Sequence, residues 1–275
     1  MKDDTLVSST VGKKIIMSVS GLVLFIYVVL HMLGNLQVFI DRETMDKYAA
    51  FLHYGLDGQM EKALWLVRIV LLGAILAHVY FAISLYAQSK RARKQGYAKR
   101  QWMKASVSSR SMIYGGLFLG LFIVFHLLHF TIGAVGFGDT ALAFGNHMQF
   151  GASEAYRNVY TSFMSPMIAG IYILAMVFLG LHLYHGSWSM FQTLGVNHPR
   201  FKRMLQVSMR ITGVAIAFGF ALIPLLIVTG IAQPRDLHPH ELPPGHERYE
   251  APPAHEIDDD ASSMGHDNQV VVYDA

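Results

Sequence analysis

Histidine recurs inside the long apolar stretches of this sequence, where an ionisable side chain is costly unless it is paired or bound. Four of the five stretches carry one in their interior, at His31, His78, His126 and His182. A neutral imidazole offers a nitrogen lone pair to a metal, and two imidazoles can fill both axial positions of a haem iron. Such an iron has no open site for oxygen and suits electron transfer. The four histidines therefore predict two pairs of haem ligands.

The elements that must position these histidines are membrane-spanning helices. Apolar residues make up 53% of the sequence and charged residues only 15%, a composition typical of membrane proteins. At ~1.5 Å per residue, each apolar stretch can cross a hydrocarbon core of about 30 Å. The predicted spans are 15–40, 63–87, 112–135, 166–191 and 209–231. We therefore expect an all-α membrane protein, a five-transmembrane-helix bundle that encloses two b haems.

Basic residues flank alternate ends of these spans, before the first, between the second and third, and between the fourth and fifth. The positive-inside rule assigns that side to the cytoplasm. We expect a cytoplasmic N-terminus (1–14) without a cleavable signal, a haem-binding domain (15–231) and a proline-rich, disordered outer tail (232–275) in the inner membrane of a prokaryote. The connections on the outer side are expected to be loops, with a short amphipathic piece around 152–160.

Depth in the membrane sorts the histidines into two levels. Counted from the cytoplasmic end of each helix, His31 and His126 lie about 24 and 21 Å up, and His78 and His182 about 13 and 10 Å up. This predicts an outer pair, His31 with His126, and an inner pair, His78 with His182. Nine glycines in the spans open room for flat porphyrins or serve plain helix packing: Gly21, Gly34, Gly73, Gly115, Gly116, Gly120, Gly170, Gly180 and Gly213.

Further histidines leave the ligand choice open. His129 follows His126 by three residues and His185 follows His182 by three, so each shares a helix face with its neighbour and depth does not separate them. His53 and His147 are expected in outer loops, as surface or quinone-pocket residues. The absence of cysteine assigns any iron–sulfur cluster to another subunit. The predicted spans contain no Asp or Glu, which argues against an ion-coupled transporter.

The histidine-bearing segments resemble a known family, the cytochrome b membrane-anchor subunits of succinate dehydrogenase and fumarate reductase, of the single-polypeptide, five-helix, dihaem type. The resemblance spans roughly residues 12–233. It rests on the order of these strings along the chain: Gly12-Lys13-Lys14, Ser20-Gly21-Leu22, His31-Met32-Leu33-Gly34-Asn35-Leu36, Ala77-His78-Val79-Tyr80, Phe125-His126-Leu127-Leu128-His129-Phe130, and Leu181-His182-Leu183-Tyr184-His185-Gly186-Ser187-Trp188-Ser189.

The resemblance implies two stacked b haems, a quinone substrate that is usually menaquinone, and docking onto a cytoplasmic iron–sulfur subunit that carries a flavoprotein. The dicarboxylate chemistry belongs to those partners, and no nucleic acid is expected. The family ligand lies four residues before a glycine, which selects His182 over His185. The same matching assigns His31 and His126 as the ligands of the outer haem, with His129 as the weaker candidate.

One departure affects protons. Some relatives have a glutamate, linked to proton movement, where this chain has Gly180. Protons for quinone chemistry are then expected from outer groups such as Asp41, Glu43, Asp57 or Glu61. Arg68, near the outer end of the second span, is either a propionate or quinone partner or a snorkelling interfacial side chain.

Two other functions are compatible with the sequence. One is the cytochrome b subunit of a membrane hydrogenase or formate dehydrogenase, which also uses histidine pairs and a quinone but fits one histidine per helix less well. The other is a transporter of haem or a small molecule whose histidines bind cargo transiently.

Overall fold

The computed structural model describes Val7, residues 9–92, 107–136, 154–196, 198–234 and Leu237. Within these residues every regular element is helical, and five helices are long and apolar enough to cross a membrane. This confirms the predicted all-α class and the number of spans. The spans are Thr10–Phe39, Gln59–Arg91, Met112–Thr131, Pro166–Thr193 and Lys202–Val228.

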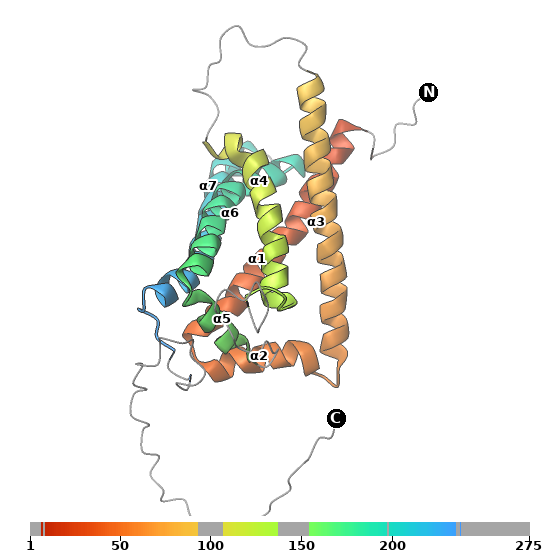
Figure 1. Ribbon diagram of the computed structural model, residues 1–275. Coiled ribbons are helices and arrows are strands. Elements are labelled where there is room, and N and C mark those ends of the chain that lie inside the picture. The colour runs from red at the N-terminus through yellow and green to blue at the C-terminus, as the bar shows by residue number, and fades with distance from the viewer. Residues whose placement is uncertain are drawn as a thin grey trace, which may run out of the picture.

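The elements follow one another as a bundle with two extra helices at one end (Figure 1). In chain order they are α1 (Thr10–Asn35), the 3-10 helix η1 (Leu36–Phe39), α2 (Arg42–Tyr54), α3 (Gln59–Arg91), α4 (Val107–His126), the π-helix η3 (Leu127–Thr131), α5 (Ala155–Phe163), α6 (Pro166–Thr193) and α7 (Pro199–Val228).

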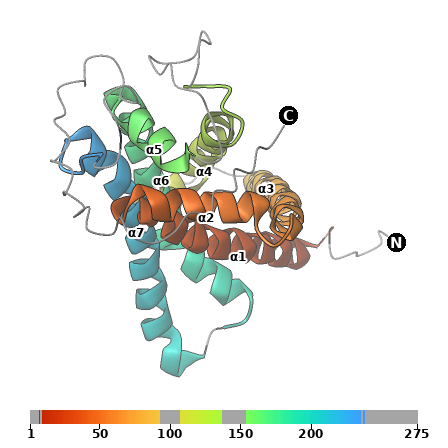
Figure 2. The same cartoon turned by 90° about the horizontal axis from the view of Figure 1, so that it is seen from below.

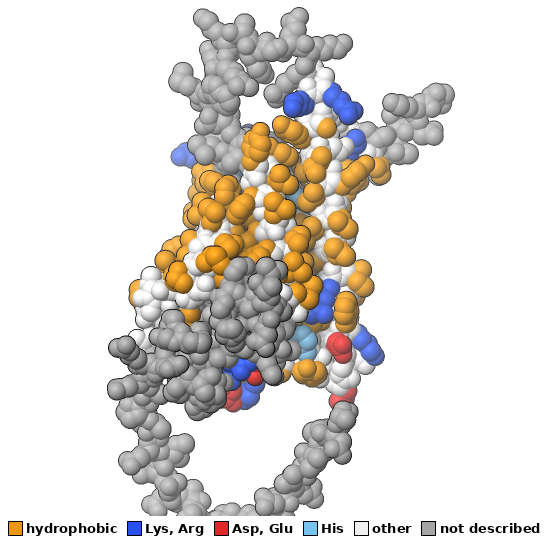
Figure 3. Space-filling view, in the orientation of Figure 1, with side chains coloured by type: hydrophobic (Ala, Val, Ile, Leu, Met, Phe, Trp, Pro, Cys, Tyr) orange, Lys and Arg blue, Asp and Glu red, His pale blue; other side chains and the backbone are white. Residues whose placement is uncertain are grey.

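Hydrophobic side chains cover the middle of the bundle, and charged side chains gather toward its two ends (Figure 3). Large apolar residues such as Leu66, Leu121 and Ile211 are more than 60% exposed. A water-facing surface of this kind would aggregate, whereas lipid tails solvate it. The surface therefore agrees with a multi-pass membrane protein.

Two pairs of spanning helices pack most extensively, α6 with α7 and α1 with α3, and α4 packs against α6. α7 lies tightly on α6, because a Cβ added to Gly213 would be 2.9 Å from the Cβ of Leu183, and the Ser187 hydroxyl contacts the Met209 carbonyl at 3.2 Å. α3 is joined to α1 by polar contacts, among them a hydrogen bond of 3.1 Å from Lys13 to the Ser84 hydroxyl. Small residues at the α6–α7 contact serve helix packing, one of the two uses predicted for the glycines.

Four of the five spanning helices, all except α6, begin before the predicted start of the span. α7 begins at Pro199, ten residues before the predicted fifth span, and α1 begins at Thr10. Basic residues mark the membrane surface but do not end a helix, which can continue into water when it is capped. His198 and Ser9 supply these caps by accepting hydrogen bonds from the backbone N–H groups of Arg200 and Gly12.

The connection between the first two spans is a helix rather than the predicted loop. α2 lies across one end of the bundle, beside the start of α3 (Figure 2). Asp41 caps it, because its carboxylate accepts a hydrogen bond of 2.6 Å from the backbone N–H of Thr44. Long apolar stretches do not reveal this shorter, polar helix, although Asp41 followed by Glu43 in the first turn is a helix-start pattern.

The predicted amphipathic piece between the third and fourth spans is confirmed as α5. It is buried along most of its length and belongs to a cluster at this end of the bundle, formed by Val38, Met45, Tyr156, Val159, Tyr160, Phe163, Ile168, Ala169, Tyr172, Ile223, Ile227 and Leu237. We call the end that carries α2 and α5 the capped end and the opposite one the basic end, since exposed basic residues lie there, including Lys90, Arg91, Arg200, Lys202 and Arg203.

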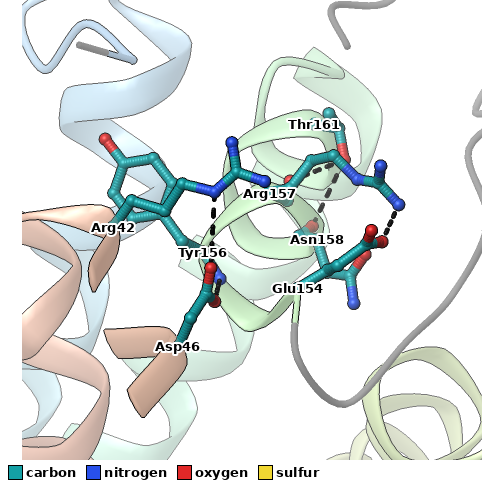
Figure 4. A network of polar contacts seen from close by, with 7 residues as sticks. All are labelled: Arg42, Asp46, Glu154, Tyr156, Arg157, Asn158 and Thr161. Carbon is teal, nitrogen blue, oxygen red and sulfur yellow. Dashed lines mark hydrogen bonds and ion pairs between the residues drawn. The ribbon is translucent and has the colours of Figure 1, made fainter. Parts of the chain in front are cut away.

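A polar network ties α5 to α2 at the capped end (Figure 4). The Asp46 carboxylate accepts a hydrogen bond of 2.9 Å from the backbone N–H of Tyr156, the second residue of α5, and pairs with Arg42 at 3.4 Å. Glu154, the residue before α5, forms an ion pair with Arg157 and does not cap its own helix. Asp46 therefore acts as an N-cap supplied by a neighbouring helix.

Candidate haem sites

Two histidines from α1 and α4 meet near the capped end. The imidazole centroids of His31 and His126 are 5.8 Å apart, with an interplanar angle of 76°. Aromatic rings surround them: Tyr27 stacks on His31 at 5.3 Å, and Phe220 of α7 lies 5.6 Å from it. These are the two residues predicted as the outer pair, so the structure brings them together.

A second pair, from α3 and α6, meets closer to the basic end. The centroids of His78 and His182 are 6.2 Å apart at an interplanar angle of 63°. Nδ1 of His78 lies 3.1 Å from the Met17 carbonyl of α1. Because a carbonyl only accepts, His78 carries its proton on Nδ1, and its Nε2 keeps a lone pair for a metal. The acceptor for this ligand candidate on α3 therefore comes from a different helix, α1.

Two glycines next to the inner pair show how far apart the two histidine pairs lie along the helices. A Cβ added to Gly21 would lie 3.2 Å from Cε1 of His78, and one added to Gly116 would lie 3.7 Å from Cε1 of His182. Gly21 is ten residues before His31 on α1, and Gly116 is ten residues before His126 on α4. Ten residues of helix span about 15 Å. Both helices thus place the pairs about 15 Å apart along their axes, more than the roughly 10 Å expected from span ends.

The structure separates His126 from His129. Two side chains three residues apart on an α-helix would share a face. After His126, however, α4 changes to the π-helix η3, and its wider turn points His129 in a different direction. His129 is 0% exposed, stacked on Phe125 at 5.6 Å and packed on Phe130 at 4.2 Å. A Cβ added to Gly136 would be 2.6 Å from its ring. Protein atoms enclose His129 on every side, which leaves no face for a porphyrin.

On α6 the ring that faces His78 belongs to His182. His185 lies about one turn nearer the basic end, within electrostatic reach of Arg210 of α7, whose guanidinium is 4.9 Å from the Tyr184 ring centroid. Nδ1 of His182 is buried without a hydrogen-bond partner among the described residues. A buried nitrogen of this kind is unfavourable unless something binds it.

A residue that the sequence analysis missed is Tyr172 of α6. Its hydroxyl lies 3.2 Å from Nδ1 of His126 and 2.9 Å from Nδ1 of His129. Tyrosine is common on apolar helices, so its type alone is uninformative. Its position in the sequence could have indicated a role: Tyr172 is ten residues before His182 on the same helix. This spacing places Tyr172 about 15 Å from His182, near the level of the outer pair.

The outer groups considered as proton donors have local roles. Asp41 caps α2, and the Thr44 backbone N–H holds the pKa of its carboxyl below the usual value, so it stays ionised at neutral pH. Glu43 pairs with Lys47 at 2.5 Å. Both line an open, shallow hollow together with Arg42 and Asp46. An ionised cap is a poor proton donor, which disfavours Asp41 in that role.

Other predicted residues lie apart from the two pairs. His53 is on α2, not in a loop, and its Nδ1 is 2.9 Å from the Ala49 carbonyl. The Arg68 guanidinium lies 5.0 Å from the Trp65 ring centroid, a contact expected of an interfacial anchor. Gly180 faces the Cβ of Ala217 in the α6–α7 contact. His147 and the tail beyond Leu237 lie outside the described residues.

The donor set of each pair fits a haem. Imidazoles on opposite sides of one metal, at metal–nitrogen distances of about 2.0–2.1 Å, have centroids roughly 6 Å apart. The observed separations are 5.8 and 6.2 Å. Two nitrogens are too few ligands for a bare ion, whereas a porphyrin supplies four more. The contact of Nδ1 of His78 with the Met17 carbonyl leaves Nε2 free to bind a metal, which agrees with this donor set.

Comparison with known proteins returned no match: no family model, no curated protein and no solved structure is similar to this chain.

Proposed function

We propose that this chain is a dihaem cytochrome b that anchors a succinate dehydrogenase or fumarate reductase to the membrane. In this role it passes electrons between an iron–sulfur subunit and a membrane quinone. The observation that carries the proposal is the meeting of four histidines, from four different spans, as two pairs at separate levels of one bundle. The order of histidine-bearing strings along the sequence, which resembles that family, supports it.

Each pair is assigned to one haem: His78 and His182 to the inner haem, and His31 and His126 to the outer haem. When bound, a haem b with two imidazole ligands supplies a one-electron carrier without an open coordination site. The chain contributes the ligands and their orientation, through the Met17 carbonyl for His78 and the Tyr172 hydroxyl for His126. Apolar helices keep water away from both pairs.

The basic end is proposed to face the cytoplasm and the soluble partners. Lys90, Arg91, Arg200, Lys202 and Arg203 are exposed there, as the positive-inside rule requires of a cytoplasmic surface. The iron–sulfur subunit, with its flavoprotein, would dock at this end, next to the inner haem. Quinone reduction or oxidation is proposed to take place near the capped end, next to the outer haem.

The test is a reduced-minus-oxidised spectrum with haem quantification on the complex purified from membranes. Two b haems per chain are expected. His78→Ala and His31→Ala should each leave one haem, because each removes one ligand of a different pair. His53→Ala, on α2, is the matched control and should leave both haems.

Two results would contradict the assignment of these histidines as haem ligands. If the purified chain holds no haem, or if both haems survive both substitutions, the histidine pairs are not the ligands. Co-purification with a flavin-containing and an iron–sulfur polypeptide that oxidises succinate supports this family of complexes. Partners that oxidise hydrogen or formate instead would assign the chain to the alternative cytochrome b.

A further inference from the structure

The Tyr172 hydroxyl lies between two histidine nitrogens, and this arrangement carries an inference about the outer site. The hydroxyl has one hydrogen to donate, while both neighbours present the same atom, Nδ1, at 3.2 Å from His126 and 2.9 Å from His129. Tyr172 is buried, and these two nitrogens are its hydrogen-bond neighbours among the described residues, so its hydrogen has an acceptor only if the hydroxyl donates to one nitrogen and accepts from the other. The two histidines must then carry their protons on different ring nitrogens.

The proposed role of His126 decides the direction. A neutral imidazole that binds iron through Nε2 carries its proton on Nδ1, so His126 donates to the Tyr172 oxygen. The hydroxyl hydrogen of Tyr172 then points to His129, whose Nδ1 accepts it, and the His129 proton resides on Nε2. With His126 bound through Nε2, these tautomers satisfy both contacts.

We propose that Tyr172, held by His129, is the positioning residue of the outer haem: it accepts the Nδ1–H of His126 and so fixes the tautomer, ring orientation and basicity of that ligand. The inference rests on the proposed function and deepens it. It gives His129 a role other than iron ligation, as the acceptor that orients the tyrosine hydroxyl.

The surroundings hold all three side chains in place. The Tyr172 ring packs against Phe122 at 5.0 Å and Phe163 at 4.9 Å, both edge to face. His129 is fully buried, and Gly136, at φ +90°, passes so close that any Cβ there would meet the imidazole. Tyr172 itself is 7% exposed. A hydroxyl confined in this way has no water to replace a lost partner, so the hydrogen bonds are costly to break.

The primary test is a redox titration of the purified complex carrying Tyr172→Phe, which removes the hydroxyl and keeps the ring. An imidazole ligand that donates Nδ1–H to an acceptor is more basic and favours ferric iron. Removing the acceptor hydroxyl should therefore raise the reduction potential of the outer haem. We expect about a tenfold change in the ferric-to-ferrous ratio at a fixed potential, which is about 59 mV for one electron. The inner-haem potential should not move.

Matched variants separate this role from a structural one. Tyr160→Phe removes another buried hydroxyl at the same end, one that donates to the Gln233 carbonyl at 3.4 Å, and should leave both potentials unchanged. His129→Leu, which removes the acceptor for Tyr172, should shift the outer potential in the same direction as Tyr172→Phe. His129→Asn restores an acceptor near the position of Nδ1 and should return the potential toward that of the unaltered protein.

Each failure has a separate meaning. A Tyr172→Phe complex with two haems and an unchanged outer potential overturns the inference and leaves the proposed function intact. Loss of one haem in His129→Leu but not in His126→Ala also overturns it, because His129 would then be the ligand. If the unaltered complex contains no haem, the proposed function itself fails.

Discussion

Each histidine pair brings together imidazoles from two helices, and the pairs differ in what contacts Nδ1 of one imidazole, His126 in the outer pair and His78 in the inner pair. In the outer pair the acceptor for His126 is a side chain, the Tyr172 hydroxyl, and aromatic rings enclose both imidazoles. In the inner pair the acceptor for His78 is main chain, the Met17 carbonyl, and glycines lie against both rings. The outer pair is therefore adjustable by substituting one side chain, whereas the inner pair depends on how closely the helices approach.

The two ends of the bundle differ in a related way. At the capped end α2 and α5 add a small polar and aromatic layer over the outer pair, held by Asp46 and the cluster around Tyr160. The inner pair is held by the spans themselves, through the contact of α1 with α3. Perturbing helix approach should thus affect the inner pair first, and perturbing the capped end should affect the outer pair first.

The largest effect is expected from Gly21→Leu. A Cβ at this position is already 3.2 Å from the His78 ring, and a leucine would displace the imidazole from the position where it meets His182. We expect loss of the inner haem with retention of the outer one, measured as haem per chain and by the redox titration.

Gly73→Leu is the control for this substitution. Gly73 is on α3, exposed, with nothing within 4 Å of an added Cβ, so leucine there should leave both haems in place. Equal loss of both haems in Gly21→Leu would show that the variant disturbs the whole bundle, and the claimed difference between the pairs would fail.

A smaller effect is expected from Asp46→Ala at the capped end. Removing an N-cap costs about 0.5–2 kcal/mol, and here the cap belongs to a different helix, so α5 would lose both its cap and its tie to α2. Outer-haem release on heating should begin at a lower temperature, while inner-haem release changes less. Glu43→Ala, which breaks only an exposed ion pair with Lys47, should leave both unchanged.

Much of this arrangement could be predicted from the sequence. Span length and apolar composition predict five helices, and counting residues along them pairs His31 with His126 and His78 with His182. Depth could not choose between His126 and His129, because the choice depends on the π-helix after His126, which no periodicity in Leu127-Leu128-His129 indicates. The Met17 carbonyl and the Tyr172 hydroxyl also escaped prediction, since contacts between helices depend on rotation about their axes.

The smallest effect, and the one that sharpens the comparison most, is expected from Met17→Leu. The Met17 group that accepts from His78 is the backbone carbonyl, which a side-chain substitution of similar volume leaves in place. The inner-haem potential should therefore stay within a small fraction of the shift expected for Tyr172→Phe at the outer haem, measured by the same titration. A shift of equal size in Met17→Leu would mean that the inner ligand is also tuned by side-chain packing, and the contrast between a side-chain and a main-chain acceptor would not explain how the two sites differ.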